Sequence, residues 1–371
     1  MQFATELSLS RGSVELPIFL PVATRGFVKA VPMQKINEMG IKVLISNSVY
    51  LTISPGLETL EKTNGINGYT GFKGSYFTDS GGFQILREEL VKIEKDGILF
   101  KDRKSGKSVK VTPEISSEIQ SKIRSDVAMM LDDCPPYGED KKRYSESVLR
   151  TYEWGKKFSA FKEPGQKRFG IIQGGFDADL RRESADLMTS LEFDGFALGG
   201  LKIGEPKELT DLVLTKTLPL IPKEFPVYLM GVGDPISILE YSGAGIGVFD
   251  STYPTRNARH GFALTGDGPV NLKNAKHSYD HGPIELGCSC ETCTYYSKTK
   301  LRELHKNEDP SFQYLVTVHN LDFMQRFMHS IRNDHEKAKS VAKKYNKIII
   351  DSWSSWSLPT RDRSSSDSSL Q

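Results

Sequence analysis

The sequence predicts an α/β fold: a (β/α)8 TIM barrel with a β-hairpin insertion and a C-terminal metal-binding subdomain. Eight short apolar runs each end at a glycine or a polar residue; in order they are LPIFLPV, IKVLIS, SYFT, DVAMML, FGII, GFAL, PVYLM and GIGVF. Stretches with helical spacing separate the runs, and three cysteines cluster after the last run. Eight alternating strands and helices are typical of a closed parallel barrel, whose chemistry lies at the carboxyl ends of its strands.

The segments between the runs are expected to form the helices of the barrel. Six of them have helical spacing or helix-start signals: residues 33–40, 113–123, 143–161, 177–191, 207–220 and 235–245. The clearest start is Thr112, a good helix cap, followed by Pro113 at the first helical position. Residues 85–111 interrupt this order with alternating apolar and charged residues and two turn signals. They predict a β-hairpin inserted after the third strand, on the face where an active site would lie.

Composition divides the chain into three parts. We expect the barrel over residues 1–270, a metal-binding subdomain with a final helix (321–344) over residues 271–344, and a tail over residues 345–371. The tail is serine-rich and non-periodic, which is typical of disorder. Its two tryptophans, Trp353 and Trp356, could form a docking motif, but composition favours a dispensable tail.

Bulk properties exclude several classes of protein. No apolar stretch is long enough to span a bilayer, and the N-terminal residues lack the apolar core of a signal peptide. We therefore expect a cytoplasmic protein without a membrane partner. The formal net charge is +2, so bulk charge does not indicate a nucleic-acid partner, and any basic surface must be local.

A cysteine cluster near the C-terminus indicates a metal site. It holds three of the four cysteines, at Cys288, Cys290 and Cys293. In a cytoplasmic chain such spacing favours metal binding over disulfides. With His319, the three thiolates match a closed tetrahedral zinc site, so we predict one structural Zn²⁺. His281 and His305 are alternative fourth ligands, but His319 is expected to begin the final helix. The competing interpretation is three ordinary cysteines and a core histidine.

Three aspartates follow strand-like runs: Asp79, Asp132 and Asp250. In a barrel these strand ends converge on one pocket. Carboxylates that share a pocket suggest nucleophilic or general acid–base chemistry at an electrophilic carbon, as in glycosyl transfer. Any one of them could instead cap the helix that follows its strand. Three at strand ends, interleaved with paired glycines, favour a common site.

Glycines and a few larger side chains define the ligand expected in that pocket. The glycines are 81, 82, 174, 175, 199, 200 and 231, and they would let a flat ligand approach the backbone closely. Phe83 and Met230 could sandwich a planar ring. Gln173 could both donate and accept hydrogen bonds along a base edge.

Seven motifs together resemble the tRNA-guanine transglycosylases, enzymes that exchange a guanine in tRNA for a 7-deazaguanine. They are TDSGGFQ (78–84), DDCPPY (132–137), IIQGG (171–175), ALGGLKIGEP (197–206), YLMGVG (228–233), FDSTYPTRNARHG (249–261) and CSCETC with VHN. The resemblance covers about residues 15 to 330 and implies a TIM barrel with a zinc subdomain.

The resemblance also implies roles for individual residues. Asp250 matches the nucleophile that attacks the ribose C1′ and forms a covalent tRNA intermediate, and Asp79 matches the general acid–base group. The residues implied to bind the base are Asp132, Gln173, Gly200, Phe83, Met230, Ser80, Gly199 and Gly231. Arg256 and Arg259 match residues that hold the tRNA anticodon region. Lysines and an arginine that would extend this basic surface are Lys273, Lys276, Lys298, Lys300 and Arg302.

The identity of the incoming base is a further expectation. Bacterial relatives insert preQ1 and eukaryotic ones queuine at the wobble guanine, whereas archaeal ones insert preQ0 in the D-arm and carry extra C-terminal RNA-binding domains. This chain ends soon after the metal region, which favours the wobble guanine of tRNAs with a GUN anticodon. Ile203 stands where the bacterial type has valine and the eukaryotic type glycine, and its branched side chain leaves less room for queuine. We therefore favour preQ1.

Two other functions compete with this interpretation. One is a non-catalytic accessory subunit of the same family, against which the presence of Asp250 and Asp79 argues. The other is a retaining glycosidase that uses the same two carboxylates, which would not need a metal site beside Arg256 and Arg259. Family members work as dimers, so we expect a homodimer or a heterodimer with a paralogue. The interface would lie at the metal region, with Tyr295, Tyr296 and Leu301 as apolar anchors.

Overall fold

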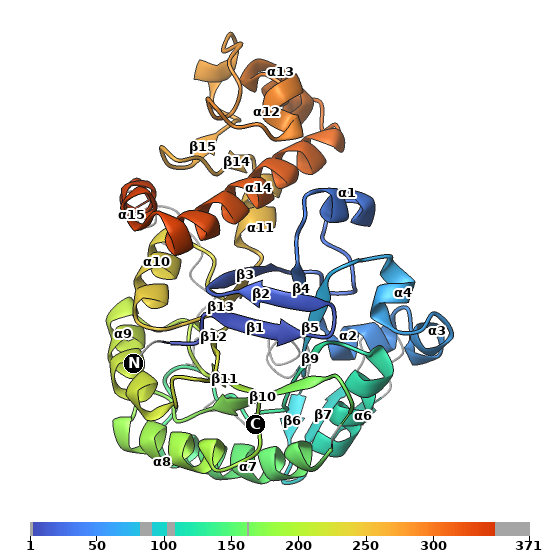
Figure 1. Cartoon of the computed structure of the whole chain (residues 1–371), viewed down its shortest axis with the longest axis vertical. Coiled ribbons are helices and arrows are strands. Elements are labelled where there is room, and N and C mark those ends of the chain that lie inside the picture. Colours follow the sequence, from blue (N-terminus) through green and yellow to red (C-terminus); the bar gives the residue numbers. More distant parts are fainter. Residues whose placement is uncertain (1–2, 82–90, 102–107, 162, 346–371) are drawn as a thin grey trace, which may run out of the picture.

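Eight parallel strands form one closed sheet, which confirms the predicted barrel (Figure 1). The computed structural model describes residues 3–81, 91–101, 108–161 and 163–345. The strands, in order around the sheet, are β3 (Ile18–Pro21), β13 (Val248–Ser251), β12 (Val227–Leu229), β11 (Gly195–Leu198), β10 (Lys167–Ile172), β9 (Val127–Met129), β5 (Ser75–Asp79) and β4 (Val43–Asn47). Val22 and Ile45 form a parallel bridge that brings β3 back to β4 and closes the sheet.

Helices surround the sheet on its outer face (Figure 1). In chain order they are α1 (Met33–Glu38), α2 (Ser48–Ile53), α3 (Leu57–Lys62), α4 (Ile66–Thr70), α6 (Pro113–Ile123), α7 (Lys141–Ala160), α8 (Ala178–Thr189), α9 (Lys207–Thr217), η1 (Leu218–Leu220) and α10 (Pro235–Gly243). As predicted, α6 begins after Thr112, whose hydroxyl accepts a hydrogen bond from the Ile115 N–H at 3.3 Å. All six predicted barrel helices are present, with ends shifted by a few residues.

An N-terminal hairpin closes one end of the barrel, a feature that the sequence analysis missed. Its strands are β1 (Glu6–Leu9) and β2 (Gly12–Glu15). The segment contacts residues on the amino-terminal side of barrel strands. The Ala4 N–H donates to the Lys223 carbonyl at 3.0 Å, in the turn before β12, and the Ser10 hydroxyl donates to Asp126, directly before β9. The hairpin therefore covers the amino ends of the strands and leaves the carboxyl ends for chemistry.

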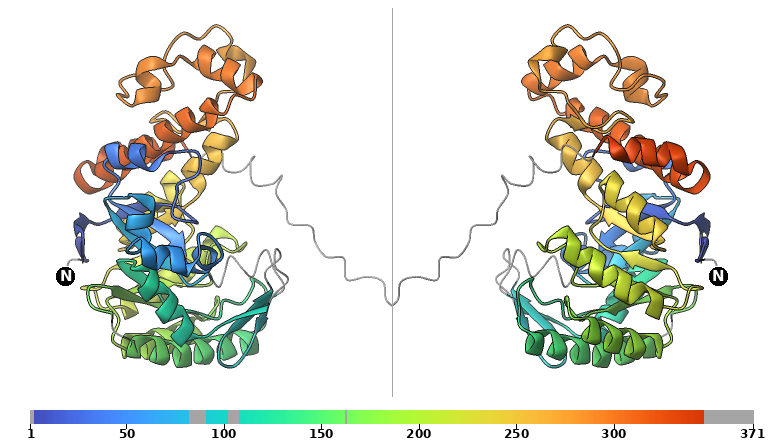
Figure 2. Two further views of the ribbon diagram at one scale, coloured as in Figure 1. Left: turned by 90° about the vertical axis from the view of Figure 1, so that its right-hand side faces the viewer. Right: turned by 90° about the vertical axis from the view of Figure 1, so that its left-hand side faces the viewer.

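The predicted insertion after β5 is present, and it has one strand more than a single hairpin. The strands are β6 (Val91–Ile93), β7 (Ile98–Lys101) and β8 (Ser108–Val111), and each pairs antiparallel with the next. Ile98 and Val111 are buried against Trp154 of α7, which stabilises the extra strand. Figure 2 shows this small sheet on the opposite side of the barrel from the N-terminal hairpin, the side of the carboxyl strand ends.

The C-terminal region extends from the top of the barrel in Figure 1. It consists of α11 (Tyr253–Arg259), β14 (Phe262–Ala263), β15 (Val270–Asn271), η2 (Ala275–His277), α12 (Glu291–Tyr295), α13 (Lys298–Lys306), α14 (Ser311–Asn333) and α15 (His335–Lys343). Helix α14 runs between the barrel and the outer elements. Its first half packs with the cysteine cluster, and its second half packs into the barrel core through Phe323, Met324 and Phe327.

The predicted final helix over 321–344 was wrong at both its start and its continuity. Helix α14 begins ten residues earlier because Phe312, Leu315 and Val316 supply a buried apolar face. Asp334 then leaves helical geometry, and its side chain caps α15 by accepting a hydrogen bond from the Lys337 N–H at 3.1 Å.

The predicted tail begins in the core rather than outside it. Tyr345 is buried, and its hydroxyl donates to the Thr265 carbonyl at 2.9 Å. The rest of the predicted tail, including both tryptophans, lies outside the described residues. Within the part of the chain that the structure describes, no helix has the length and apolar character needed to cross a membrane.

Candidate functional site

Asp79 ends β5 at the carboxyl face of the barrel. It lies beside Asn47, its register partner on β4, and accepts a hydrogen bond from the Gly81 N–H at 2.9 Å. Burial, with a smaller contribution from the nearby Asp250, raises the pKa of Asp79 to about 8, against the hydrogen bond from Gly81. This carboxyl group is therefore suited to exchange a proton near neutral pH.

Asp250 lies in β13, close enough for its charge to affect Asp79. Burial raises the pKa of Asp250, but two donors favour its ionised form: the Gly231 N–H at 2.9 Å and the Tyr228 hydroxyl at 2.7 Å. Both contact the same oxygen, Oδ1. Tyr228 is fully buried on β12 and was missed at the sequence level, although it opens the YLMGVG motif. The two aspartates thus have different surroundings, as an acid–base group and a nucleophile require.

Asp132 and Gln173 form a polar pair at the ends of β9 and β10. The Gln173 Nε2 donates to Asp132 Oδ2 at 2.6 Å. Burial raises the pKa of Asp132 to about 6, and the Gln173 hydrogen bond opposes this shift. The Gln173 Oε1 is buried without a hydrogen-bond partner among the described residues. A buried acceptor without a partner costs free energy, so this oxygen is suited to receive a donor from a ligand.

Gly199 and Gly200 pack directly on the Gln173 amide. A Cβ at position 199 would lie 2.4 Å from Gln173 Nε2, and one at position 200 would lie 2.8 Å from Gln173 Oε1. Any side chain at either position would therefore displace the glutamine. Gly200 also has a φ of +68°, which disfavours other residues. The Gln173 amide thus explains the absence of side chains at both positions, and the close approach of a flat ligand stays a prediction.

The remaining residues predicted to bind the base are distributed around these two groups. Ser80 is buried directly after Asp79, and Met230 is half-buried between Tyr228 and the exposed Gly231. Phe83, the other predicted stacking residue, lies outside the described residues.

A second aspartate next to Asp132 fixes the loop that carries it. Asp133 is fully buried and accepts two hydrogen bonds from Arg143, at 2.5 and 2.8 Å, and one from Arg150. Its backbone carbonyl accepts the Ser147 hydroxyl at 2.5 Å. All three partners lie on α7, which ties the loop after β9 to that helix. The sequence did not reveal the role of Arg143 and Arg150, because charged residues at such positions of an amphipathic helix are usually exposed to solvent.

The predicted metal ligands are brought together. The ligand atoms of Cys288, Cys290, Cys293 and His319 all lie within 4.8 Å of one another. The His319 Nε2 is 2.8 Å from the Leu264 carbonyl, so this nitrogen donates and Nδ1 faces the three sulfurs, at 3.3 to 3.8 Å. Such a backbone partner is typical of metal-bound histidines. The group could hold one metal ion. His319 lies in the middle of α14, not at its start, so the reason given for preferring it was wrong, although the structure does group it with the three cysteines.

The neighbouring residue connects this cluster to the active site. Asn320 is fully buried; its side-chain amide donates to the carbonyls of Pro254 and Phe262, at 2.9 and 3.0 Å, and accepts the Leu264 N–H at 2.8 Å. These bonds fix α14 to the segment that directly follows Asp250. The metal cluster therefore supports α11, which carries the two predicted tRNA-binding arginines.

Those arginines lie close together on α11. Arg256 is exposed, and Arg259 is half-buried with its Nη1 3.0 Å from the Thr255 carbonyl. Burial lowers the pKa of Arg259, and the neighbouring Arg256 lowers it further. Adjacent cations of this kind favour a polyanion.

Part of the predicted basic surface is used within the protein instead. Lys298 pairs with Asp280 at 3.2 Å and donates to the Pro283 carbonyl at 2.8 Å. Arg302 pairs with Glu303 at 3.0 Å and donates to the Asn274 carbonyl. These two residues were predicted as phosphate contacts, and the structure favours a structural role for both.

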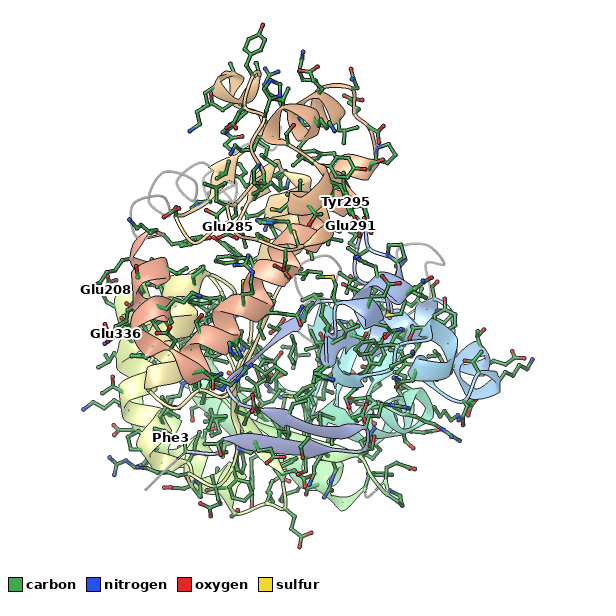
Figure 3. All side chains as sticks on the ribbon, turned by 45° about the horizontal axis from the view of Figure 1, so that its top comes forward. Phe3, Glu208, Glu285, Glu291, Tyr295 and Glu336 are labelled. Atoms are coloured by element: carbon green, nitrogen blue, oxygen red, sulfur yellow. The ribbon has the colours of Figure 1, made fainter. Side chains whose placement is uncertain are left out.

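One predicted interface anchor was also wrong. Leu301 is fully buried in the core of the C-terminal region, whereas Tyr295 is 69% exposed. Figure 3 shows Tyr295 with Glu291 and Glu285 on this region, distant from Phe3 near the N-terminal hairpin. Of Leu301 and Tyr295, only Tyr295 is exposed enough to contact another molecule.

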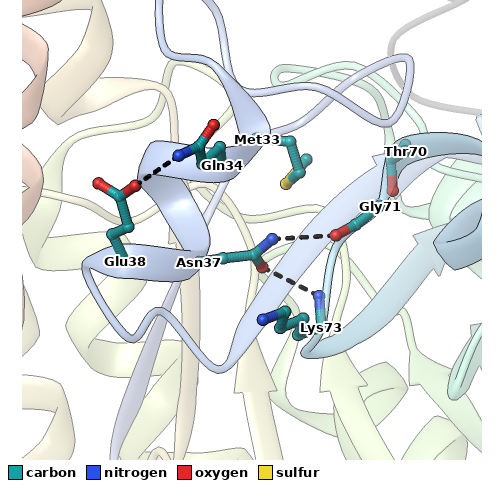
Figure 4. Close-up of a pocket in the computed structure, with 7 residues that line it drawn as sticks. All are labelled: Met33, Gln34, Asn37, Glu38, Thr70, Gly71 and Lys73. Carbon is teal, nitrogen blue, oxygen red and sulfur yellow. Dashed lines mark hydrogen bonds between the residues drawn. The ribbon is translucent and has the colours of Figure 1, made fainter.

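A surface hollow between α1 and α4 is separate from the strand ends (Figure 4). Its polar groups are paired with one another: the Asn37 side chain donates to the Gly71 carbonyl and accepts the Lys73 N–H, and Gln34 donates to Glu38. It offers no convergent groups for chemistry, so the carboxyl strand ends remain the candidate active site.

Comparison with known proteins agrees with this geometry. The family model described as queuine tRNA-ribosyltransferase matches residues 4–344. A protein of that name from Thermotoga petrophila is 39% identical over 331 residues, covering 89% of this chain and 90% of the relative. Relatives of the same name from Lysinibacillus sphaericus and Francisella tularensis subsp. novicida are 39% and 37% identical, covering 86% and 88% of this chain and 85% and 90% of their own. The chain belongs to the queuine tRNA-ribosyltransferase family.

Proposed function

We propose that this chain is a tRNA-guanine transglycosylase that exchanges the wobble guanine of GUN-anticodon tRNAs for a 7-deazaguanine during queuosine modification. The observation that supports it most is the pair Asp79 and Asp250, two neighbouring carboxyl groups with different hydrogen-bond partners. The names of the relatives support the same reaction.

In the first half of the reaction Asp250 is the nucleophile. With Oδ1 held by Tyr228 and Gly231, the carboxylate attacks the ribose C1′ through Oδ2. The C1′–N9 bond breaks, a C1′–O bond to Asp250 forms, and the electron pair of the broken bond stays on the guanine. Asp79, whose raised pKa of about 8 keeps it protonated at neutral pH, supplies the proton that neutralises the leaving base.

In the second half the direction reverses. The incoming 7-deazaguanine gives its N9 proton to Asp79, and N9 attacks C1′. The ester bond to Asp250 breaks, and the carboxylate returns to its ionised state. Covalent attachment keeps the tRNA bound while one base leaves and another enters.

Base recognition is assigned to the polar pair and the glycine loop. Asp132 and the Gln173 Oε1 accept N–H groups of the base, and the Gly200 N–H donates to its carbonyl oxygen. Met230 stacks on the ring, as Phe83 is predicted to do from its motif, and Arg256 with Arg259 contacts the tRNA backbone.

A base-exchange assay tests the proposed function. We expect the protein to release labelled guanine from position 34 of a GUN-anticodon tRNA when preQ1 is added. A tRNA with adenine at the wobble position is the matched control and should give no reaction. Retention of the label in the GUN-anticodon tRNA would contradict the proposal.

The preferred incoming base is proposed to be preQ1. Ile203 is half-buried in the loop after β11, where Glu205 Oε2 accepts its N–H at 2.9 Å. We expect wild-type protein to use preQ1 in preference to queuine, and Ile203→Gly to narrow this preference by about tenfold because a side chain is removed from the pocket. Competition between the two bases for one tRNA measures the ratio. A wild-type preference for queuine would contradict the assignment.

The metal in the Cys3His cluster is proposed to be zinc, in a structural role, because three thiolates and one imidazole form a closed tetrahedral set. We expect about one zinc per chain by elemental analysis, and its loss in a Cys290→Ser/Cys293→Ser variant together with a lower melting temperature. Cys134→Ser, which removes the cysteine outside the cluster, is the control and should keep the metal. Equal zinc in both variants would overturn the assignment.

A further inference from the structure

A buried arginine behind the glycine loop has no role in the scheme above. Arg181 lies in the first turn of α8 and is fully buried. Its guanidinium donates to three backbone carbonyls: Nε to Gly175 at 2.8 Å, Nη1 to Ile172 at 2.9 Å and Nη2 to Gly199 at 2.8 Å. Among the residues that the structure describes, no carboxylate lies within ion-pair distance of it, although Glu205 is near enough to act on its charge. Burying an arginine without a carboxylate is costly, so its position demands a reason.

The three carbonyls lie at the end of β10 and in the loops after β10 and β11, where the base is proposed to bind. Ile172 and Gly175 flank Gln173 after β10, and Gly199 precedes Gly200 after β11. The Ile172 carbonyl also accepts the Gly199 N–H at 3.0 Å, so Arg181 joins a contact that already links the two loops. One side chain thus fixes both loops relative to each other.

The contact with Gly199 has a consequence for Gly200. The Gly199 carbonyl and the Gly200 N–H belong to one planar trans peptide, so they point in opposite directions. A donor that holds this carbonyl therefore also sets the direction of the N–H. Because the donor is a cation, it polarises the peptide and strengthens the N–H as a donor. The glycines at both positions have no side chains to restrict this peptide. It is held by the Arg181 contact and by the approach of the Gly200 N–H to the Cys134 thiol.

We propose that Arg181 is a positioning residue for base recognition, which aims the Gly200 N–H at the carbonyl oxygen of the bound base. The inference rests on the proposed function. It predicts that loss of Arg181 weakens recognition of the carbonyl oxygen of the base, in addition to lowering the stability of the fold.

A second buried arginine provides a matched control. Arg168 lies near the start of β10, the strand that ends at Ile172. Its guanidinium donates to the carbonyls of Ser159, Phe161 and Glu192. It is also buried and bound to backbone carbonyls, but it lies near the opposite end of the strand from the pocket. Loss of either arginine should lower stability, and only loss of Arg181 should affect recognition.

The test compares guanine with 6-thioguanine, which has a sulfur, a weaker hydrogen-bond acceptor, in place of the carbonyl oxygen. KM is measured for labelled guanine entering a GUN-anticodon tRNA, and Ki for 6-thioguanine as competitor. We expect the ratio of Ki for 6-thioguanine to KM for guanine to be about tenfold or more in the wild-type and Arg168→Met proteins. In Arg181→Met we expect this ratio to be less than about threefold. KM for tRNA should stay unchanged in all three.

The outcomes are distinguishable. If wild-type protein does not incorporate guanine, the proposed function fails. If it does, and Arg181→Met discriminates as well as wild type, or Arg168→Met loses discrimination equally, only the role of Arg181 is overturned. Should Arg181→Met not fold, Arg181→Lys, which retains one donor group, is expected to show a smaller loss of discrimination. Unchanged discrimination in that variant would overturn the inference.

Discussion

Replacing Asp250 with asparagine is expected to abolish base exchange and covalent attachment to tRNA together. Asparagine keeps the shape of the side chain and can still accept the hydrogen bonds of Tyr228 and Gly231, so the fold should be preserved. The amide is a much weaker nucleophile than a carboxylate. Removing a nucleophile of this kind typically lowers kcat by about 10⁴-fold or more. The labelled-guanine assay measures the rate, and denaturing electrophoresis detects the adduct.

A variant of the supporting tyrosine separates the nucleophile from its surroundings. Tyr228→Phe removes one hydrogen bond to Asp250 Oδ1 but leaves the carboxylate and the Gly231 contact in place. We expect this protein to form the adduct at a reduced rate. If Asp250→Asn retained more activity than Tyr228→Phe, Asp250 would not be the nucleophile.

The second large effect is expected at Asp79, where asparagine should remove activity and stabilise the fold above about pH 5. Activity falls because asparagine cannot exchange the proton of N9, a contribution of about 10²–10⁴-fold. Stability rises because burial disfavours the ionised carboxylate of Asp79, an unfavourable term that asparagine lacks.

The sign of the pH dependence follows from the raised pKa of Asp79. The native state holds this proton up to about pH 8, whereas the unfolded chain loses it near the ordinary value of 3.8. Between these limits the native state binds more protons, so the contribution of Asp79 to stability declines as pH rises, by up to about 1.4 kcal/mol per pH unit. The advantage of Asp79→Asn over wild type should therefore grow from pH 5 to pH 8.

Denaturant unfolding of wild type and variant at a series of pH values measures this difference. Asp132→Asn is the matched control: the pKa of Asp132 is raised by burial to only about 6, so its advantage should stop growing near that pH. If the free energy of unfolding of Asp79→Asn exceeded that of wild type by a constant amount between pH 5 and pH 8, the raised pKa of Asp79 would be contradicted.

The sequence predicted the barrel and the strand-end residues because both depend on local patterns. Apolar runs that end at Asp79, Gln173, Gly199 or Asp250 place these residues by strand position alone. The cysteine cluster was equally local, since three ligands lie within six residues.

Features that depend on distant contacts could not be predicted in the same way. Arg181 resembles a surface residue of an amphipathic helix until its three backbone acceptors are seen. Tyr228 resembles a core tyrosine until Asp250 is placed beside it. The two strands of the N-terminal hairpin and the third strand of the insertion are only four residues each, too short for a sequence pattern to identify. Packing against the rest of the protein stabilises them.

Isolation of the covalent intermediate tests the central claim most directly. Wild-type protein is incubated with a GUN-anticodon tRNA, denatured and digested with nuclease and protease, and the modified peptide is identified by mass spectrometry. We expect a ribosyl adduct on Asp250, formed by wild type, absent from Asp250→Asn, and discharged when preQ1 is added before denaturation. An adduct on any other residue, or an adduct that persists in Asp250→Asn, would contradict the account.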